Sequence, residues 1–403
     1  MWSITLNKSF VDGQLLRRTA LFTCMLLSGG NLIFPRIPLA ALLVVICILI
    51  QGIRFLTRRE FGFCIFILLL TFVLAILNAD DIFNSVIAVR FANFLLGLMI
   101  LSIYIDAGGD AFVDDIYPIL KFMCFQSIAT TIVGLIAPAA FSPFYVDDAS
   151  YYTIGLILTF HTTVEGGSAL VRPDGFFYEP GVFQLYLNMF AYFAMFVRRI
   201  RKDFALAVVA VLCTQSTTGV FIVSGLVGLY FLRPTNNSPK IAWVMQIILI
   251  APIVMGILLA IISTNVDNKF TGANRGSSWA REYDLWTGLA IASEYPLTGI
   301  GFDYDRYYQE AYYLGYKESK LDDHTIINRS SSNGIVAVFY SLGFLVGSIY
   351  IYGLFRQKFI RGLVFPSIIF VSLLTEAFFF TPMILMFVFS GMLRSHHKID
   401  QVY

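Results

Sequence analysis

Long apolar segments follow one another along most of the chain and are separated by short polar turns. A run of about 20 apolar residues is long enough to cross a bilayer as a helix. The pattern therefore predicts an all-α polytopic integral membrane protein. We expect about twelve membrane-spanning helices, near residues 19–34, 38–56, 60–78, 82–105, 116–137, 180–197, 203–214, 217–232, 241–263, 333–355, 363–376 and 380–393.

Four of these segments are short and form two neighbouring pairs, one divided near Thr214 and the other between Glu376 and Pro382. Each pair is compatible with two short helices or with one broken helix, so the expected number varies by about two.

Two longer polar stretches, residues 138–179 and 264–332, interrupt the apolar pattern. Neither is large enough to fold separately, so residues 1–403 are predicted to form a single membrane domain. With a cytoplasmic N-terminus, 18 of the 28 Lys and Arg residues fall on the cytoplasmic side, nine fall outside and Arg90 lies within a span. The positive-inside rule then places both termini in the cytoplasm and both polar stretches in the periplasm. The acidic loop 106–115 fits this assignment least well.

Composition supports a membrane setting, since 58% of residues are apolar, 13% are charged and the mean hydropathy is +0.75. A net charge of +2 with short basic clusters between spans gives no reason to expect nucleic acid as a partner. All five cysteines fall in apolar segments, which argues against a disulfide framework. No metal-ligand spacing or phosphate-binding Gly-rich motif occurs, so we expect no metal and no other cofactor.

The strongest local motif runs from Arg172 to Gly181, Arg-Pro-Asp-Gly-Phe-Phe-Tyr-Glu-Pro-Gly, immediately before a span. Pro180 suits a first helical position, and the start of a helix attracts anions. Arg172 could bind phosphate oxygens, and Tyr178 is a further candidate for contact with the substrate. Alternatively, Arg172 pairs with Asp174 or Glu179 and closes the loop, which is about equally consistent with the spacing.

The second polar stretch carries Arg275 and Arg281, followed by an amphipathic segment. Cations near one surface suit a departing pyrophosphate. Salt bridges to Glu282 and Asp284 are the alternative. Further along, a tyrosine-rich segment at 304–316 is typical of a membrane interface, although its rings could also stack on sugars.

Two other residues stand out by their positions. His324 follows two acids and has the titration range of a proton acceptor, although such a residue is more often simply solvated. Arg90 lies within a predicted span, where a charge costs about 2.5 to 3.5 kcal/mol. It could bind lipid phosphate, pair with a buried acid such as Glu376, or reach an interface.

The motif before the span at 180–197 resembles that of bacterial O-antigen and exopolysaccharide repeat-unit polymerases. Further elements occur in the order of that family: Gln215–Gly219, Arg281 ahead of Pro296–Phe302, and Asn333 ten residues before Gly343. The resemblance covers roughly residues 165–355 together with the topology.

The resemblance implies a multi-pass enzyme of the bacterial inner membrane that joins oligosaccharides linked to undecaprenyl pyrophosphate on the periplasmic face. Arg172 and Arg281 are then the expected pyrophosphate clamp, with Arg275, Arg90, Asn333 and Tyr178 as further substrate-binding candidates. A chain-length regulator and a flippase are the implied partners, besides the lipid bilayer.

The related O-antigen ligases carry His-Asn at the start of the later span, whereas this chain has Ser332-Asn333. This difference favours a polymerase over a ligase. It leaves the proton acceptor open, with Glu179 as the first candidate and His324 as the second. A transporter or flippase of lipid-linked sugars, or a scaffold, are the alternatives from other classes.

Overall fold

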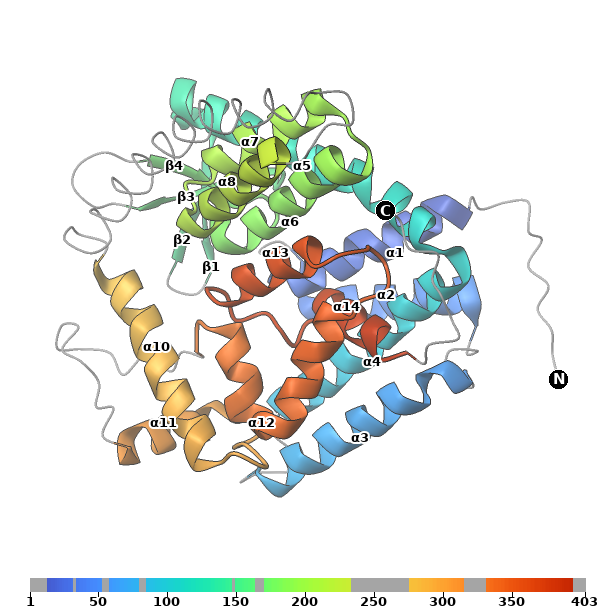
Figure 1. The fold of residues 1–403 in the computed structure, drawn as a ribbon. Helices are drawn as coiled ribbons and strands as arrows, with labels where there is room; N and C mark the ends of the chain where they lie inside the picture. The colour runs from blue at the N-terminus through green and yellow to red at the C-terminus, as the bar shows by residue number, and fades with distance from the viewer. Residues whose placement is uncertain are drawn as a thin grey trace.

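The computed structural model describes residues 13–31, 34–52, 58–79, 85–146, 149–163, 170–232, 275–314 and 331–393. The chain is mostly helical in these regions (Figure 1). The main helices are α1 (Gly13–Ser28), α2 (Arg36–Gln51), α3 (Gly62–Leu77), α4 (Ser85–Ala107), α5 (Gly109–Ile136), α6 (Pro180–Tyr192), α7 (Arg201–Cys213), α8 (Thr217–Leu232), α10 (Arg275–Glu294), α11 (Tyr304–Tyr313), α12 (Gly334–Phe355), α13 (Val364–Leu373) and α14 (Pro382–Met392).

Five of the described helical segments are long and apolar enough to cross a membrane: Arg59–Leu77, Ser85–Ala107, Gly109–Ile136, Pro180–Val197 and Gly334–Phe355. Four shorter apolar helices accompany them. The two short pairs are separate helices, because α7 and α8 are divided by a turn at residues 214–216, and α13 and α14 by residues 374–381. The predicted span at 241–263 lies outside the described residues.

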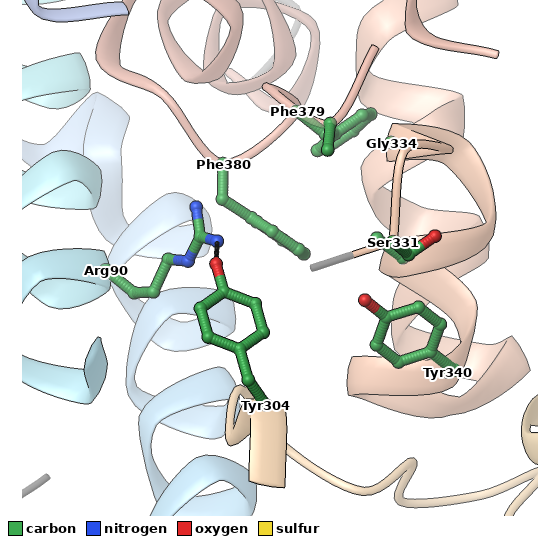
Figure 2. A pocket seen from close by; sticks show the side chains of 9 residues that line it. Arg90, Tyr304, Ser331, Gly334, Tyr340, Phe379 and Phe380 are labelled. Carbon is green, nitrogen blue, oxygen red and sulfur yellow. Dashed lines mark hydrogen bonds between the residues drawn. The ribbon is translucent and has the colours of Figure 1, made fainter. Parts of the chain in front are cut away.

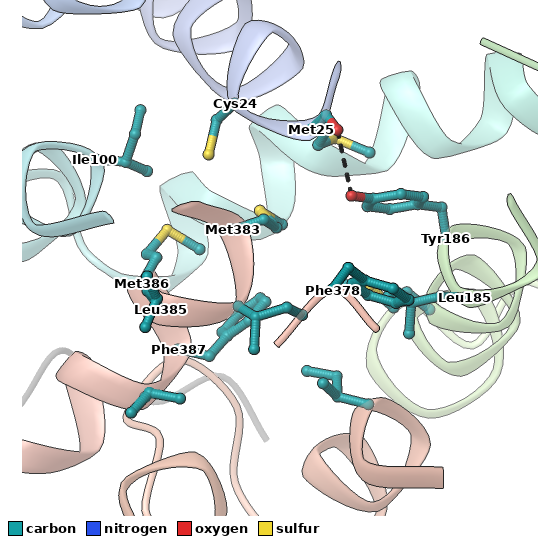
Figure 3. Close-up of a cluster of buried hydrophobic side chains, with 14 of the residues drawn as sticks. Cys24, Met25, Ile100, Leu185, Tyr186, Phe378, Met383, Leu385, Met386 and Phe387 are labelled. Atoms are coloured by element: carbon teal, nitrogen blue, oxygen red, sulfur yellow. Dashed lines mark hydrogen bonds between the residues drawn. The ribbon is translucent and has the colours of Figure 1, made fainter. Parts of the chain in front are cut away.

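Helix α14 lies at the centre of the bundle and packs against α1, α4 and α12. Figure 3 shows Met383, Met386 and Phe387 of this helix facing side chains from α1 and α6. Tyr186 of α6 donates its hydroxyl hydrogen bond to the carbonyl of Met25 at 3.4 Å. Both α6 and α14 are almost entirely buried, so the two helices form the apolar core that supports the loops at their ends.

A break in α12 explains the Pro296–Phe302 motif. Gly343 has φ of 73°, so the carbonyls before it lose their helical partners. The amides of Ile300 and Gly301 donate to the carbonyls of Tyr340 and Ser341 at 2.8 and 3.0 Å. In return, Phe344 N–H donates to the carbonyl of Pro296 at 2.7 Å. The motif thus satisfies the backbone of a broken helix, as membrane proteins require.

The expectation of an all-α chain is wrong in the first polar stretch. Four antiparallel strands form a sheet in the order β1-β2-β3-β4, with β1 at Ser142–Val146, β2 at Ala149–Ile154, β3 at Leu158–Thr163 and β4 at Leu170–Pro173. One face carries Phe160 and Val171, which pack with Phe141 and with Val133 of α5. The sheet is therefore held by packing on a distant helix, which local sequence patterns do not reveal.

The acidic stretch 106–115, predicted as a loop, forms the end of α4 and the start of α5, and its acids pair with arginines from three other segments. Arg17 Nε donates to Asp115 at 2.8 Å, Arg58 pairs with Asp106, and Arg198 with Asp114. All three arginines come from segments that the sequence assigns to the cytoplasmic side. The contacts therefore gather these segments at one end of the bundle and explain why acids occur among basic clusters.

Candidate functional site

The segment from Arg172 to Pro180 descends from the sheet into the start of α6. Gly175 has φ of 63° and permits a tight turn, in which Phe177 N–H donates to the Asp174 carbonyl at 3.1 Å. Tyr178 N–H then donates to the carbonyl of Gly30 at 3.1 Å. Glu179 is the N-cap residue of α6 but its side chain makes no capping hydrogen bond, and Pro180 occupies the first turn. The first turn of α6 thus lacks the side-chain cap that most helices carry.

Glu376 lies directly against this helix start, although it is far away in sequence. A Cβ atom at Gly181 would come within 1.8 Å of Glu376 Oε1, so only glycine leaves room for the carboxylate. Gly334, at the start of α12, makes similar room for the Glu376 carbonyl, which would lie 2.6 Å from an added Cβ. The segment between α13 and α14 is therefore wedged between the N-terminal ends of two helices.

Arg281 from the second polar stretch contacts this carboxylate, and Arg172 from the first lies within electrostatic range of both. Arg281 Nη2 of α10 lies 3.7 Å from Glu376 Oε1, with the arginine side chain 33% exposed. Burial lowers the pKa of the Arg172 guanidinium, an effect opposed by Asp174 and Glu179 and, more weakly, by Glu376. Arg281 lies close enough to add to the lowering. Two cations and three carboxylates thus share one region.

Arg172 retains hydrogen-bonding capacity in this arrangement. Its Nε atom is buried and has no hydrogen-bond partner among the described residues. A buried, unpaired guanidinium N–H is costly, and an anionic ligand would satisfy it.

A histidine that the sequence analysis did not single out lies beside Arg172. His161 and Arg172 are paired across β3 and β4, and Tyr151 of β2 is paired with His161 on its other side. The three residues form a row on the sheet face opposite to the apolar one, and the Tyr151 hydroxyl donates to the Tyr178 carbonyl at 3.0 Å. The row therefore faces the segment that leads into α6.

His161 forms a close pair with an acid. Its Nδ1 lies 2.8 Å from Asp174 Oδ1, with the His161 side chain 22% exposed and Asp174 fully buried. Burial raises the pKa of the Asp174 carboxyl to about 6, and the neighbouring His161 and Arg172 counteract this effect. Such a pair holds the imidazole in one orientation and leaves the second ring nitrogen available.

Arg90 lies in a pocket between α4, α11 and α12 (Figure 2). Its Nη2 donates to the Tyr304 hydroxyl at 2.7 Å, and its guanidinium lies 5.6 Å from the centre of the Phe380 ring. Glu376 has its ion pair with Arg281 instead. Ser331, Gly334 and Tyr340 complete the polar side of the pocket. An aromatic and hydroxyl environment therefore accommodates this charge near the N-terminal end of α4.

Asn333 acts as the N-cap of α12. Its side-chain oxygen accepts hydrogen bonds from the amides of Ile335 and Val336 at 3.1 and 3.0 Å. The preceding residue, Ser332, donates from its amide and hydroxyl to Asp284 at 2.8 and 2.7 Å. The place where ligases carry a histidine is thus part of a capping network in this chain.

Of the remaining predicted site residues, one is exposed and two lie wholly or partly outside the described part of the chain. The Tyr178 side chain is 39% exposed beside Gly30, where it can meet a ligand. Arg275 begins α10, but its side chain lies outside the described part, as does the whole of His324. Among the residues that the structure describes, no group of three or more His, Cys, Asp or Glu side chains could hold a metal ion.

Sequence reasoning missed the His161–Asp174 pair and the position of Glu376. Alternation along β3 and β4 could have placed His161 and Arg172 on one face had the strands been recognised. The contact of Glu376 with Gly181 joins segments almost two hundred residues apart and leaves no local signal.

Comparison with known proteins gives one positive result. A family model described as O-Antigen ligase matches residues 204–351, which include α7, α8, α10, α11 and most of α12. No curated protein matches the chain, and no solved structure matches it. The matched region contains Arg281, the Pro296–Phe302 motif and Asn333. This match supports membership of the O-antigen polymerase/ligase superfamily.

Proposed function

We propose that the chain is a polymerase that joins oligosaccharide repeat units linked to undecaprenyl pyrophosphate. The reaction takes place at the periplasmic face of the bacterial inner membrane, in O-antigen or exopolysaccharide synthesis. One observation carries the proposal: Arg172 from the first polar stretch and Arg281 from the second converge on the start of α6.

The proposed clamp binds the pyrophosphate of the donor. Glycosyl transfer breaks the bond between the sugar C1 atom and the pyrophosphate oxygen, and negative charge grows on the departing group. Two arginines and the dipole of an uncapped helix stabilise that charge. Arg172 is suited to this role because its Nε is buried without a partner.

Glu376 serves as an internal anion at this site. Its carboxylate lies where an anionic ligand would meet both Arg281 and the start of α6. The substrate then competes with this carboxylate for the arginines. The arrangement limits the repulsion between the two cations until the substrate binds.

The acceptor hydroxyl must lose a proton as its oxygen attacks C1. We assign the proton to Nε2 of His161, because Asp174 orients the ring and the imidazole adjoins Arg172. The new C–O bond replaces the C1–O bond to pyrophosphate, which leaves as an anion with the lipid, and the imidazolium returns its proton to water. Glu179, beside the clamp, is the alternative acceptor.

A reconstituted assay tests the proposal. The purified protein in proteoliposomes is given a lipid-linked repeat unit, and products are separated by length. A polymerase yields a ladder of longer lipid-linked chains, whereas Arg172→Ala and Arg281→Ala each shorten or abolish it. Failure of the wild-type protein to extend the substrate would refute the proposal.

An O-antigen ligase is the second candidate, because the matching family carries that description. A ligase uses the same donor but transfers the finished chain to a lipid A core. Adding that core to the same vesicles separates the two, since a ligase moves label onto it without lengthening the chain. A flippase would only change the side on which the unmodified donor is found.

In cells, a chain-length regulator and a flippase would act before or beside this enzyme. We propose both as partners by the chemistry of the pathway: a lipid-linked unit must reach the periplasmic face before it is polymerised.

A further inference from the structure

The turn between β2 and β3 is unusual in both conformation and composition. Gly155 and Leu156 have φ of 57° and 61°, and Ile157 N–H donates to the Ile154 carbonyl at 3.1 Å. Ile154 pairs with Leu158, so three residues connect the strands, and the first two are left-handed, a conformation for which Asn and Gly are strongly preferred. A leucine in that conformation is strained, and the side chains of Leu156 and Ile157 are 42% and 49% exposed. In water, such a tip combines strain with uncovered apolar surface.

The tip lies alongside α5 and not beyond its end. The Gln126 side chain donates to the carbonyl of Ile157, and Gln126 comes ten residues before the last residue of α5, Ile136. At 1.5 Å per residue this is about 15 Å. A second contact agrees, since the ring of Phe176 stacks on Phe122 of the same helix with centroids 6.3 Å apart.

Helix α5 is itself a membrane-spanning candidate, with 28 residues. Its length of about 42 Å exceeds the roughly 30 Å of a bilayer hydrocarbon core. Lys121, fifteen residues before Ile136, pairs with Asp203 at 3.0 Å, which marks a polar boundary about 22 Å from that end of the helix. Gln126, about 15 Å from Ile136, therefore lies within the apolar layer between them. The flank of α5 there is uncovered, with Phe125 53% and Ile132 51% exposed.

Within the sheet, only the tip extends to this depth, since Phe176 belongs to the segment that follows β4. Ser142, the first residue of β1, is paired with Thr153, so residues 154–158 project past the end of the edge strand. An unpaired strand edge is not tolerated in hydrocarbon. At the tip, the Ile154 and Ile157 carbonyls both accept hydrogen bonds, the latter from Gln126.

We propose that the β2–β3 tip, residues 154–158, inserts into the bilayer and packs against lipid acyl chains. The insertion fixes the height of the sheet relative to the membrane. His161 and Tyr151 then lie only a few residues above the apolar tip. If the proposed function holds, this places the row with Arg172 at the depth where the pyrophosphate of a lipid-anchored substrate sits.

Thiol accessibility tests the insertion without any assay of activity. Leu156→Cys is compared with Tyr145→Cys, which lies on β1 of the same sheet and whose native side chain is 72% exposed. Open membrane sheets are treated with a charged, membrane-impermeant maleimide, and the native chain with its five cysteines gives the background. We expect the tip cysteine to react at least about tenfold more slowly, as hydrocarbon excludes the charged reagent. Denaturation in detergent should restore equal labelling.

Equal labelling rates in the intact membrane would overturn the proposal, and so would efficient crosslinking of Leu156→Cys between two copies of the chain. A second variant distinguishes water from lipid by the sign of its effect. Asparagine suits the left-handed conformation, so Leu156→Asn would raise the Tm if the tip were in water. In a nanodisc we expect it to lower the Tm relative to Leu156→Gly, which relieves the same strain without placing an amide in lipid. A higher Tm for Leu156→Asn than for Leu156→Gly in the nanodisc would contradict insertion.

Discussion

The carboxylate of Glu376 and the backbone of Gly181 lie in direct contact, so closely that a Cβ at position 181 would be 1.8 Å from Glu376 Oε1. This contact joins the loop before α14 to the start of α6 and places the acid beside Arg281. The first prediction follows from its steric demand.

Gly181→Ala should destabilise the site, because both the helix start and the buried carboxylate would have to move. We expect a loss of stability of about 2 kcal/mol or more, as for other overpacked buried positions. Gly225→Ala in α8 is the control, since nothing lies within 4 Å of an added Cβ there. Thermal unfolding in one detergent measures both. Equal Tm values for the two variants would contradict the contact.

Glu376→Gln should strengthen the binding of an anion. The amide keeps the shape of the side chain but removes the charge that competes for Arg281. A partly buried pair of this kind suggests a gain of roughly 1 kcal/mol, or about fivefold in Kd. Titration calorimetry with inorganic pyrophosphate measures the change. Weaker binding would show that Glu376 supports the site in another way.

Arg172→Lys and Arg281→Lys should both reduce chain elongation, since a lysine keeps the charge but not the planar fork. Arg172 should be the more sensitive position, because its guanidinium is more deeply buried and its Nε lacks a partner. We expect kcat to fall about tenfold or more for Arg172→Lys. A full-length glycan ladder from both variants would argue against a bidentate clamp.

The pH dependence should reveal the His161–Asp174 pair. Burial raises the pKa of Asp174 to about 6, so its carboxylate forms as the pH rises through that value. Only the ionised acid holds an imidazole N–H strongly, and a protonated His161 cannot accept a proton. Activity should therefore increase with pH across this range and fall below it.

Substitutions identify the residue whose titration causes this loss of activity at low pH, called the acid limb of the pH profile. His161→Gln should abolish most activity and flatten the pH profile, and Asp174→Asn should lower the rate at all pH values. Glu179→Gln should keep the limb. The His161–Asp174 pair is also faced by Arg172, Glu179 and Tyr151, which shift the midpoint of the pH–activity curve. The assignment therefore depends on the comparison of variants and not on the pH of the midpoint. A limb that disappears in Glu179→Gln would assign the proton to that residue.

The Arg90–Tyr304 hydrogen bond should matter to folding of the pocket. Tyr304→Phe removes a partner of a charge near the membrane interface, and we expect a loss of about 1 to 3 kcal/mol. Tyr312→Phe on the exposed side of α11 is the matched control, with its side chain 65% exposed. Denaturation midpoints compare the two. A loss that is the same in both would show that the bond contributes little.

Much of the bundle could be read from local patterns. The prediction of a helix starting at Pro180 is confirmed, since a proline suits the first helical position. The break near Thr214 was also foreseen as one of two possibilities. The sheet was not, because β3 and β4 are stabilised by contacts with Val133 on a helix outside the segment.

The candidate site could be predicted only in part from local sequence patterns. Arg172 and Arg281 could be selected from the sequence by their charge in polar stretches. Their placement relative to each other could not be predicted. The structure shows the side-chain oxygen of Asn333 capping α12, and its contact with substrate stays a prediction. His161 was passed over, because a histidine gains meaning only when strand register brings it to Asp174 and Arg172.

The sequence by itself determined that the chain is a membrane protein, which segments are helical, and which superfamily its motifs resemble. These properties follow from hydropathy and from short-range stereochemistry, both of which are written in neighbouring residues. Only the tertiary structure decided that Glu376 fills the space above Gly181, that four arginines pair with acids of residues 106–115, and that a hairpin lies along α5. Such contacts depend on the packing of segments far apart in the chain, whose shapes and charges must be complementary. They cannot be predicted from either segment alone.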